Sequence, residues 1–202
     1  ANSANVVKAT LEYNAERGVY FGRYSALKVG RHTLQVLLYG EVISMDDAYL
    51  STSTNVKPGS TSTSACTAEG AGVGAGGAPI NAGESARIVV VARDAFGNAL
   101  ETGGSIFSVL ARSATYSNTG NPTAIPTEWT TNLDAIVAPP APVDRGDGTY
   151  LTTFMPSVAA TYLVEVTRSA SHIKGSPFLI TVTPAATSAV HSMLVCLTID
   201  NC

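Results

Sequence analysis

The sequence predicts an all-β chain built from sandwich modules. Three observations lead to this prediction: few charged residues, short apolar runs that alternate with a period of two, and an internal repeat with a fixed offset. Charged residues make up 13% of the 202 residues, about half of the usual share of roughly 25%. Amphipathic surface helices need many Lys, Glu and Arg residues on their solvated face, so we expect little helix.

A fixed offset of 130 positions relates two stretches of the chain. Gly18 and Gly148 are separated by this distance (148 − 18 = 130), and so are several further matching pairs. These pairs are Tyr20 and Tyr150, Tyr24 and Phe154, Val36 and Val166, Ile43 and Ile173, and Cys66 and Cys196. Because self-similarity at a fixed period is the signature of repeat architectures, we expect an array of modules.

This repeat divides the chain into three parts. Residues 1–58 correspond to the C-terminal part of a first module, residues 60–184 to a complete module, and residues 185–202 to the start of a third module or to a tail. The first module therefore lacks its early strands. Either another segment completes it, or these residues are an ordered portion of something longer.

Apolar residues occupy every second position in short runs of residues 60–184, as a strand with one buried face requires. Turn residues separate the runs, notably at residues 94–98 and 146–148. Short alternating strands at short intervals favour an immunoglobulin-like sandwich. The core that we expect contains Tyr150, Phe154, Tyr162, Val164, Phe178, Ile180, Ile88 and Val90.

Four segments of the complete module together resemble a filamin repeat. Residues 144–150 read Asp-Arg-Gly-Asp-Gly-Thr-Tyr and residues 173–178 read Ile-Lys-Gly-Ser-Pro-Phe. Residues 93–98 read Arg-Asp-Ala-Phe-Gly-Asn and residues 103–107 read Gly-Gly-Ser-Ile-Phe. The resemblance implies tandem immunoglobulin-like modules that serve as rod segments and as docking sites for other proteins.

A long insertion departs from this resemblance. Residues 112–143 are rich in Ser, Thr, Asn and Pro, contain Trp129, and are longer than the usual connection at this place in the family. Loops of this length tend to be functional or disordered. Because a Trp side chain is costly to leave in water, we expect Trp129 either to pack on the module or to contact a partner.

The resemblance also implies a docking edge, because peptides bind the related strand by adding a strand to its sheet. That strand corresponds here to residues 105–111. Phe107, Val109 and Ala111 should point inward and leave the alternate residues on the outer face. In the alternative reading, residues 112–143 fold over this face and protect the edge. The candidate partner-binding residues are Ile106, Ser108, Leu110 and Trp129.

No catalytic or metal constellation stands out, so we expect no enzyme, no cofactor and no metal site. His32, His172 and His191 are not flanked by a recognisable Ser, Cys or carboxylate arrangement. Asp144 and Asp147 are too few for calcium, which takes six or more oxygen ligands. Three cysteines, Cys66, Cys196 and Cys202, fit structural thiols better than a zinc site or a disulfide scaffold.

Several partner classes are not expected either. A net charge of -3 gives no basic stripe for nucleic acid. The longest aliphatic stretch, residues 88–92, is far shorter than the roughly 18 residues of a membrane span. Residues 145–147 spell the Arg-Gly-Asp tripeptide that integrins bind, but the glycines on either side of Asp147 favour a tight turn.

Two functions from different classes remain. The first is a structural and protein-interaction module of a larger cytoskeletal or ciliary repeat protein, with other proteins as partners. The second is an extracellular adhesion or recognition protein at the cell surface, since immunoglobulin-like repeats also work outside cells. Paired cysteines would favour the cell surface, and reduced thiols the cytoplasm.

Overall fold

The computed structural model describes residues 7–42, 53–71, 73, 78–115 and 130–186. Within these ranges the regular structure is almost entirely β-strand, and the helical content is one short 3-10 turn at Thr63–Ala65. The expectation of an all-β, immunoglobulin-like chain is therefore confirmed. No helix of the described residues is long and apolar enough to cross a membrane.

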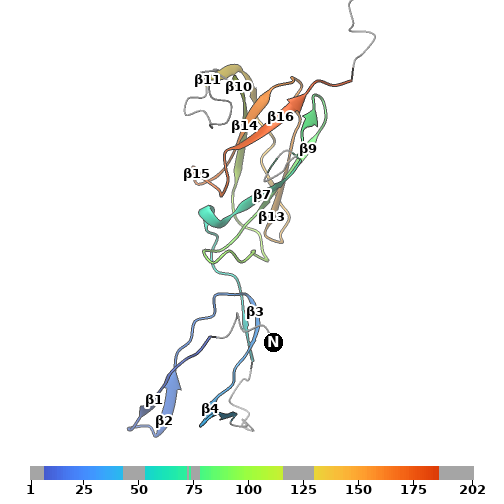
Figure 1. Cartoon of the computed structure of the whole chain (residues 1–202). Helices are drawn as coiled ribbons and strands as arrows, with labels where there is room; N and C mark the ends of the chain where they lie inside the picture. The colour runs from blue at the N-terminus through green and yellow to red at the C-terminus, as the bar shows by residue number, and fades with distance from the viewer. Residues whose placement is uncertain (1–6, 43–52, 72, 74–77, 116–129, 187–202) are drawn as a thin grey trace, which may run out of the picture.

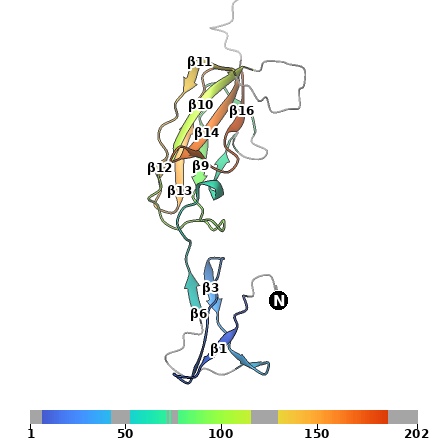
Figure 2. The same cartoon turned by 90° about the vertical axis from the view of Figure 1, so that its left-hand side faces the viewer.

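The described part of residues 60–184, for which we keep the name complete module from the sequence prediction, is a sandwich of two sheets (Figures 1 and 2). The larger sheet has the order β11-β10-β14-β16-β8, with β15 paired to β14, and all its pairs are antiparallel except β16 with β8. Its strands are β8 (Ile80–Asn81), β10 (Ser108–Thr115), β11 (Thr130–Val137), β14 (Thr161–Arg168), β15 (Ser171–His172) and β16 (Phe178–Thr183).

The smaller sheet has the order β12-β13-β9-β7. Its strands are β7 (Thr67–Gly70), β9 (Ala86–Val91), β12 (Val143–Asp144) and β13 (Thr149–Phe154). In β9, side chains at alternate positions are buried, beginning with Ala86, because one face of the strand packs on the other sheet. This alternation matches the one that the sequence predicts.

The core lies between the two sheets, and aromatic pairs connect them. The rings of Phe107 and Tyr150 lie 4.8 Å apart, and those of Phe154 and Tyr162 lie 5.3 Å apart. Tilted and edge-on pairs at these distances add to the free energy gained by burial. Seven of the eight expected core residues are buried, whereas Phe178 is half-buried and packs on the edge of the core.

The strand expected at residues 105–111 begins later, at Ser108, and extends to Thr115. Two long-range hydrogen bonds give the physical reason. The Gly104 N–H donates to a carboxylate oxygen of Asp144 at 2.6 Å, and the Ser105 N–H donates to the Tyr150 hydroxyl at 2.9 Å. These backbone donors are therefore used by side chains rather than by a neighbouring strand.

Residues 7–42 and 53–58 form three two-stranded pieces. Their pairs are β1 with β2, β3 with β6 and β4 with β5, all antiparallel. None of the described residues in this range is buried. The strands are β1 (Leu11–Asn14), β2 (Val19–Gly22), β3 (Gly30–Thr33), β4 (Leu37–Leu38), β5 (Glu41–Val42) and β6 (Ser53–Val56).

Asn98 connects this N-terminal region to the complete module. Its side-chain amide donates to the Leu27 carbonyl at 2.8 Å and accepts from the Val29 N–H at 3.4 Å. The same amide group donates to Asp94 at 2.9 Å. The turn that the sequence places at residues 94–98 is thus also a contact point between the two regions.

Candidate interaction surface

The candidate surface is built on β10, which pairs with β14 from Ser108 opposite Thr167 to Ala114 opposite Thr161. Phe107, Val109 and Ala111 point into the core and are buried. We use the name docking strip for the alternate residues Ile106, Ser108 and Leu110. Ile106 is 83% exposed, Ser108 is exposed and Leu110 is half-buried, so the expected division of faces is confirmed.

The other edge of β10 is partly occupied by the insertion itself. In Figure 2, β11 lies beside β10, and the paired residues run from Ala111 opposite Val137 to Thr115 opposite Thr130, with an irregularity after Arg112. In the described part of the chain no strand pairs with residues 108–110 on this side. The edge is therefore covered along residues 111–115 and uncovered along residues 108–110.

Proline residues end the pairing of β11 with β10. Continued at the same register, Pro139 and Pro140 would face the first residues of β10, but proline has no N–H to donate. Instead Pro139 is buried, and the carbonyl of Pro140 accepts a hydrogen bond from the Thr152 hydroxyl. The chain then crosses to the other sheet, where β12 pairs with β13.

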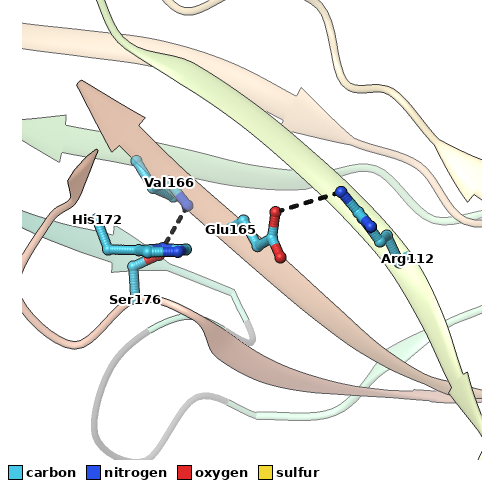
Figure 3. A network of polar contacts seen from close by, with 5 residues as sticks. All are labelled: Arg112, Glu165, Val166, His172 and Ser176. Carbon is cyan, nitrogen blue, oxygen red and sulfur yellow. Dashed lines mark hydrogen bonds and ion pairs between the residues drawn. The ribbon is translucent and has the colours of Figure 1, made fainter. Parts of the chain in front are cut away.

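Charged residues border the docking strip on the outer face of β10 and β14. Figure 3 shows the guanidinium of Arg112 directed at the carboxylate of Glu165, 3.7 Å away. The Arg112 Nε has no hydrogen-bond partner among the described residues. A half-exposed ion pair of this kind contributes little to stability.

A serine and a histidine that lie side by side in Figure 3 have a structural role. The Val166 N–H donates to the Ser176 hydroxyl oxygen at 2.8 Å, and this oxygen lies 3.0 Å from Nδ1 of His172. Nucleophilic catalysis would need a third group to orient the histidine, and no described carboxylate does so. The contacts instead fasten the turn between β14 and β16.

The Arg-Gly-Asp tripeptide lies in the turn between β12 and β13. The Asp147 carboxylate accepts hydrogen bonds from the Thr149 hydroxyl at 2.6 Å and the Thr149 N–H at 2.9 Å. These bonds, the hydroxyl first, lower the pKa of Asp147. Gly146 and Gly148 adopt positive φ angles of 78° and 81°. The carboxylate is therefore engaged within its own turn, as the turn interpretation predicts.

Of the three cysteines and the tryptophan that the sequence singles out, the structure describes only Cys66. Cys66 is a buried free thiol whose Sγ–H donates to the Ser62 carbonyl at 3.2 Å. Cys196, Cys202 and Trp129 lie outside the described residues. No group of three or more His, Cys, Asp or Glu side chains in the described part of the chain could hold a metal ion.

The two-sheet fold is that of an immunoglobulin-like module. The Filamin/ABP280 repeat family matches residues 60–179. The chain belongs to this family, whose repeats are structural and interaction modules rather than enzymes. Filamin repeats mediate contacts between proteins.

Three solved structures are similar to this chain over part of their length. The filamin domain of Lin-41 has 17% identity and a TM-score of 0.42, with 61% of this chain and 96% of that chain covered. The Escherichia coli adhesin FdeC has 15% identity and a TM-score of 0.42, covering 90% and 54%. Invasin, a bacterial integrin-binding protein, has 10% identity and a TM-score of 0.45, covering 90% and 31%.

The chain thus spans about half of the FdeC chain and about a third of the invasin chain. No curated protein sequence matches the chain.

Proposed function

We propose that the chain is a rod segment and docking module of a larger cytoskeletal or ciliary repeat protein. A partner protein adds a β-strand beside residues 108–110 of β10. The docking strip supplies the apolar contacts, and Trp129 supplies a further aromatic contact from the insertion.

The observation that carries this proposal is the uncovered start of β10. Along residues 108–110, one edge of the β10 backbone pairs with β14 and the other edge has no partner among the described strands. Ile106 and Leu110 present aliphatic surface next to this free edge. An extended peptide binds such an edge through main-chain hydrogen bonds, and alternate side chains give it specificity. Three residues make a short edge, which suits a weak contact that is multiplied along a repeat array.

The insertion acts as an internal competitor in this proposal. A partner strand longer than three residues must displace β11 from residues 111–115, because both would use the same backbone groups of β10. The free energy of β11 pairing is then subtracted from that of partner binding. Docking and self-coverage, which the sequence presents as alternatives, become two states of one edge.

Charge substitutions in the docking strip test the proposal. The double variant Ile106→Glu with Leu110→Glu should lose capture of the partner from a native extract while its thermal unfolding temperature stays close to that of the wild type. Leu179→Glu is the matched control, since Leu179 is also a half-exposed leucine of the same sheet but lies on β16. Equal capture by all three proteins would refute docking at this edge.

A second pair of substitutions tests the competition. Thr131→Pro with Ile136→Pro should break the pairing of β11, since both positions lie opposite β10. Partner capture should then increase. If capture falls instead, the insertion is part of the docking surface rather than its competitor.

The cellular setting needs its own measurement. The parent protein should sediment with the cytoskeletal or ciliary fraction, and Cys66 should be reduced, as thiols are in the cytoplasm. Labelling of the intact parent protein at the cell surface would support the adhesion alternative instead.

A further inference from the structure

The strands of residues 7–58 repeat the second half of the complete module. β4 and β5 pair Leu37 with Val42, and the offset of 130 leads to Thr167 and His172, which β14 and β15 pair in the same way. The turn residues also correspond. Tyr39 and Gly40 have φ angles of 49° and 89°, and Ser169 and Ala170 have φ angles of 50° and 61°.

The hairpin of β1 and β2 corresponds to that of β12 and β13. In the first, Asn14 Oδ1 accepts from the Arg17 N–H at 3.1 Å, and in the second, Asp144 Oδ1 accepts from the Gly146 N–H at 2.8 Å. Each turn contains a glycine with positive φ just before its second strand. The remaining pair, β3 with β6, corresponds in chain order to β14 with β16.

The first half of the module has no counterpart in this region. In the complete module β13 pairs with β12 on one edge and β9 on the other, and β14 pairs with β16 and β10. Among the described residues, β2 pairs with β1 alone and β3 with β6 alone. The two edges that should receive strands equivalent to β9 and β10 are therefore unpaired within the part of the chain that the structure describes.

The exposure of the aromatic side chains in the N-terminal region also indicates that strands are missing there. Tyr20 is 69% exposed, whereas its counterpart Tyr150 is 1% exposed. Tyr24 is 41% exposed, whereas Phe154 is fully buried. In the complete module these aromatic rings share their core with Ile88 and Val90 of β9. Large exposed apolar groups of this kind mark an interface, and isolated two-stranded hairpins are marginally stable in water.

A second copy of this chain does not fit the gap. In a second copy, β9 is already paired with β13 and β10 with β14, and both strands contribute side chains to that copy's own core. By the offset of 130, residues 185–202 correspond to residues 55–72, which precede β9. They could supply an equivalent of β7 and neither of the two missing strands.

We propose that the strands within residues 7–42 and 53–58 are an acceptor half-sandwich for the first half of a filamin-type repeat. A strand equivalent to β9 pairs with β2, and one equivalent to β10 pairs with β3, each with aliphatic residues at alternate positions. The donor is a stretch of the parent polypeptide that precedes β1, because β7, β9 and β10 precede β12 in the complete module. This interface is separate from the docking edge and does not depend on it.

Photo-crosslinking in the full parent protein tests the donor. With p-benzoylphenylalanine in place of Tyr20, irradiation should join this position to an alternating apolar segment upstream of β1 in the same polypeptide. The control position is Tyr39, which is 99% exposed and whose counterpart Ser169 stays exposed in the complete module. A crosslink from Tyr20 to a second copy or to another polypeptide, or none above the Tyr39 control, overturns the proposal.

Amide hydrogen exchange provides a test without substitutions. In the isolated 202-residue chain, peptides that cover β2 and β3 should exchange rapidly, whereas those that cover β13 and β14 should be protected. In the parent protein, exchange in β2 and β3 should slow by more than about tenfold. Equally fast exchange in both proteins would show that nothing covers these strands.

Discussion

The backbone N–H of Ser105 donates a 2.9 Å hydrogen bond to the hydroxyl of Tyr150. Tyr150 is 1% exposed, and its ring packs 4.8 Å from that of Phe107. One core residue of β13 thus fixes the segment that leads into β10. Ile106 lies between Ser105 and Phe107, and both of these neighbours contact Tyr150.

Tyr150→Phe keeps the ring and removes this acceptor. We expect the free energy of unfolding to fall by about 0.5–1.5 kcal/mol, the usual net contribution of one hydrogen bond. Partner capture should fall as well, because the segment before β10 loses its anchor. Urea unfolding and the capture assay measure the two effects. Unchanged capture would mean that Ser105 does not position the docking strip.

Phe154 and Phe178 differ in burial and should differ in their contributions to stability. Phe154 is fully buried, so Phe154→Ala should cost about 3–5 kcal/mol in urea unfolding. Phe178 is half-buried at the edge of the core, so Phe178→Ala should cost clearly less. Equal losses would contradict the register of β16.

The alternation of apolar residues at every second position was sufficient to predict the core, because this pattern indicates which face of a strand is buried. The covered edge of β10 was not predictable in this way. β11 comes from an insertion rich in Ser and Thr, and its pairing depends on residues some 20 positions away. The start of β10 depends on Asp144 and Tyr150, about 40 residues away along the chain.

Two glycines of one turn provide a matched pair of substitutions. Gly146 and Gly148 both have positive φ angles, but a Cβ on Gly146 would meet open space, whereas one on Gly148 would overlap the Leu100 carbonyl oxygen. Gly146→Ala should cost about 1–2 kcal/mol for the left-handed backbone alone. Gly148→Ala should cost more. Equal thermal shifts would contradict the close approach of these two turns.

We expect the stability of the module to depend on pH through the carboxylate of Asp94. Its carboxylate accepts hydrogen bonds from the N–H groups of Gly59, Phe96 and Asn98 and from the Asn98 side chain. Burial alone would raise the pKa of Asp94, but these bonds outweigh it and lower the pKa to about 2. Since the pKa is lower in the folded state, this stabilisation is complete above about pH 4 and is lost as the pH falls towards 2.

Asp94→Ala should therefore destabilise the module by about 1–3 kcal/mol near neutral pH, because buried donors lose their acceptor. The difference from the wild type should narrow below about pH 4 in thermal unfolding experiments. A difference that stays constant down to pH 2 would show that the Asp94 carboxylate does not carry this stabilisation.

The central claim is that β10 is covered by β11 along residues 111–115 and open to a partner along residues 108–110. Residue-resolved amide exchange in β10, measured by NMR with and without the captured partner, tests it most directly. We predict slow exchange throughout residues 111–115, fast exchange in residues 108–110 where the N–H faces away from β14, and protection of these same amides when the partner binds. Slow exchange at residues 108–110 in the free chain, or partner protection elsewhere with none at this edge, would contradict the account.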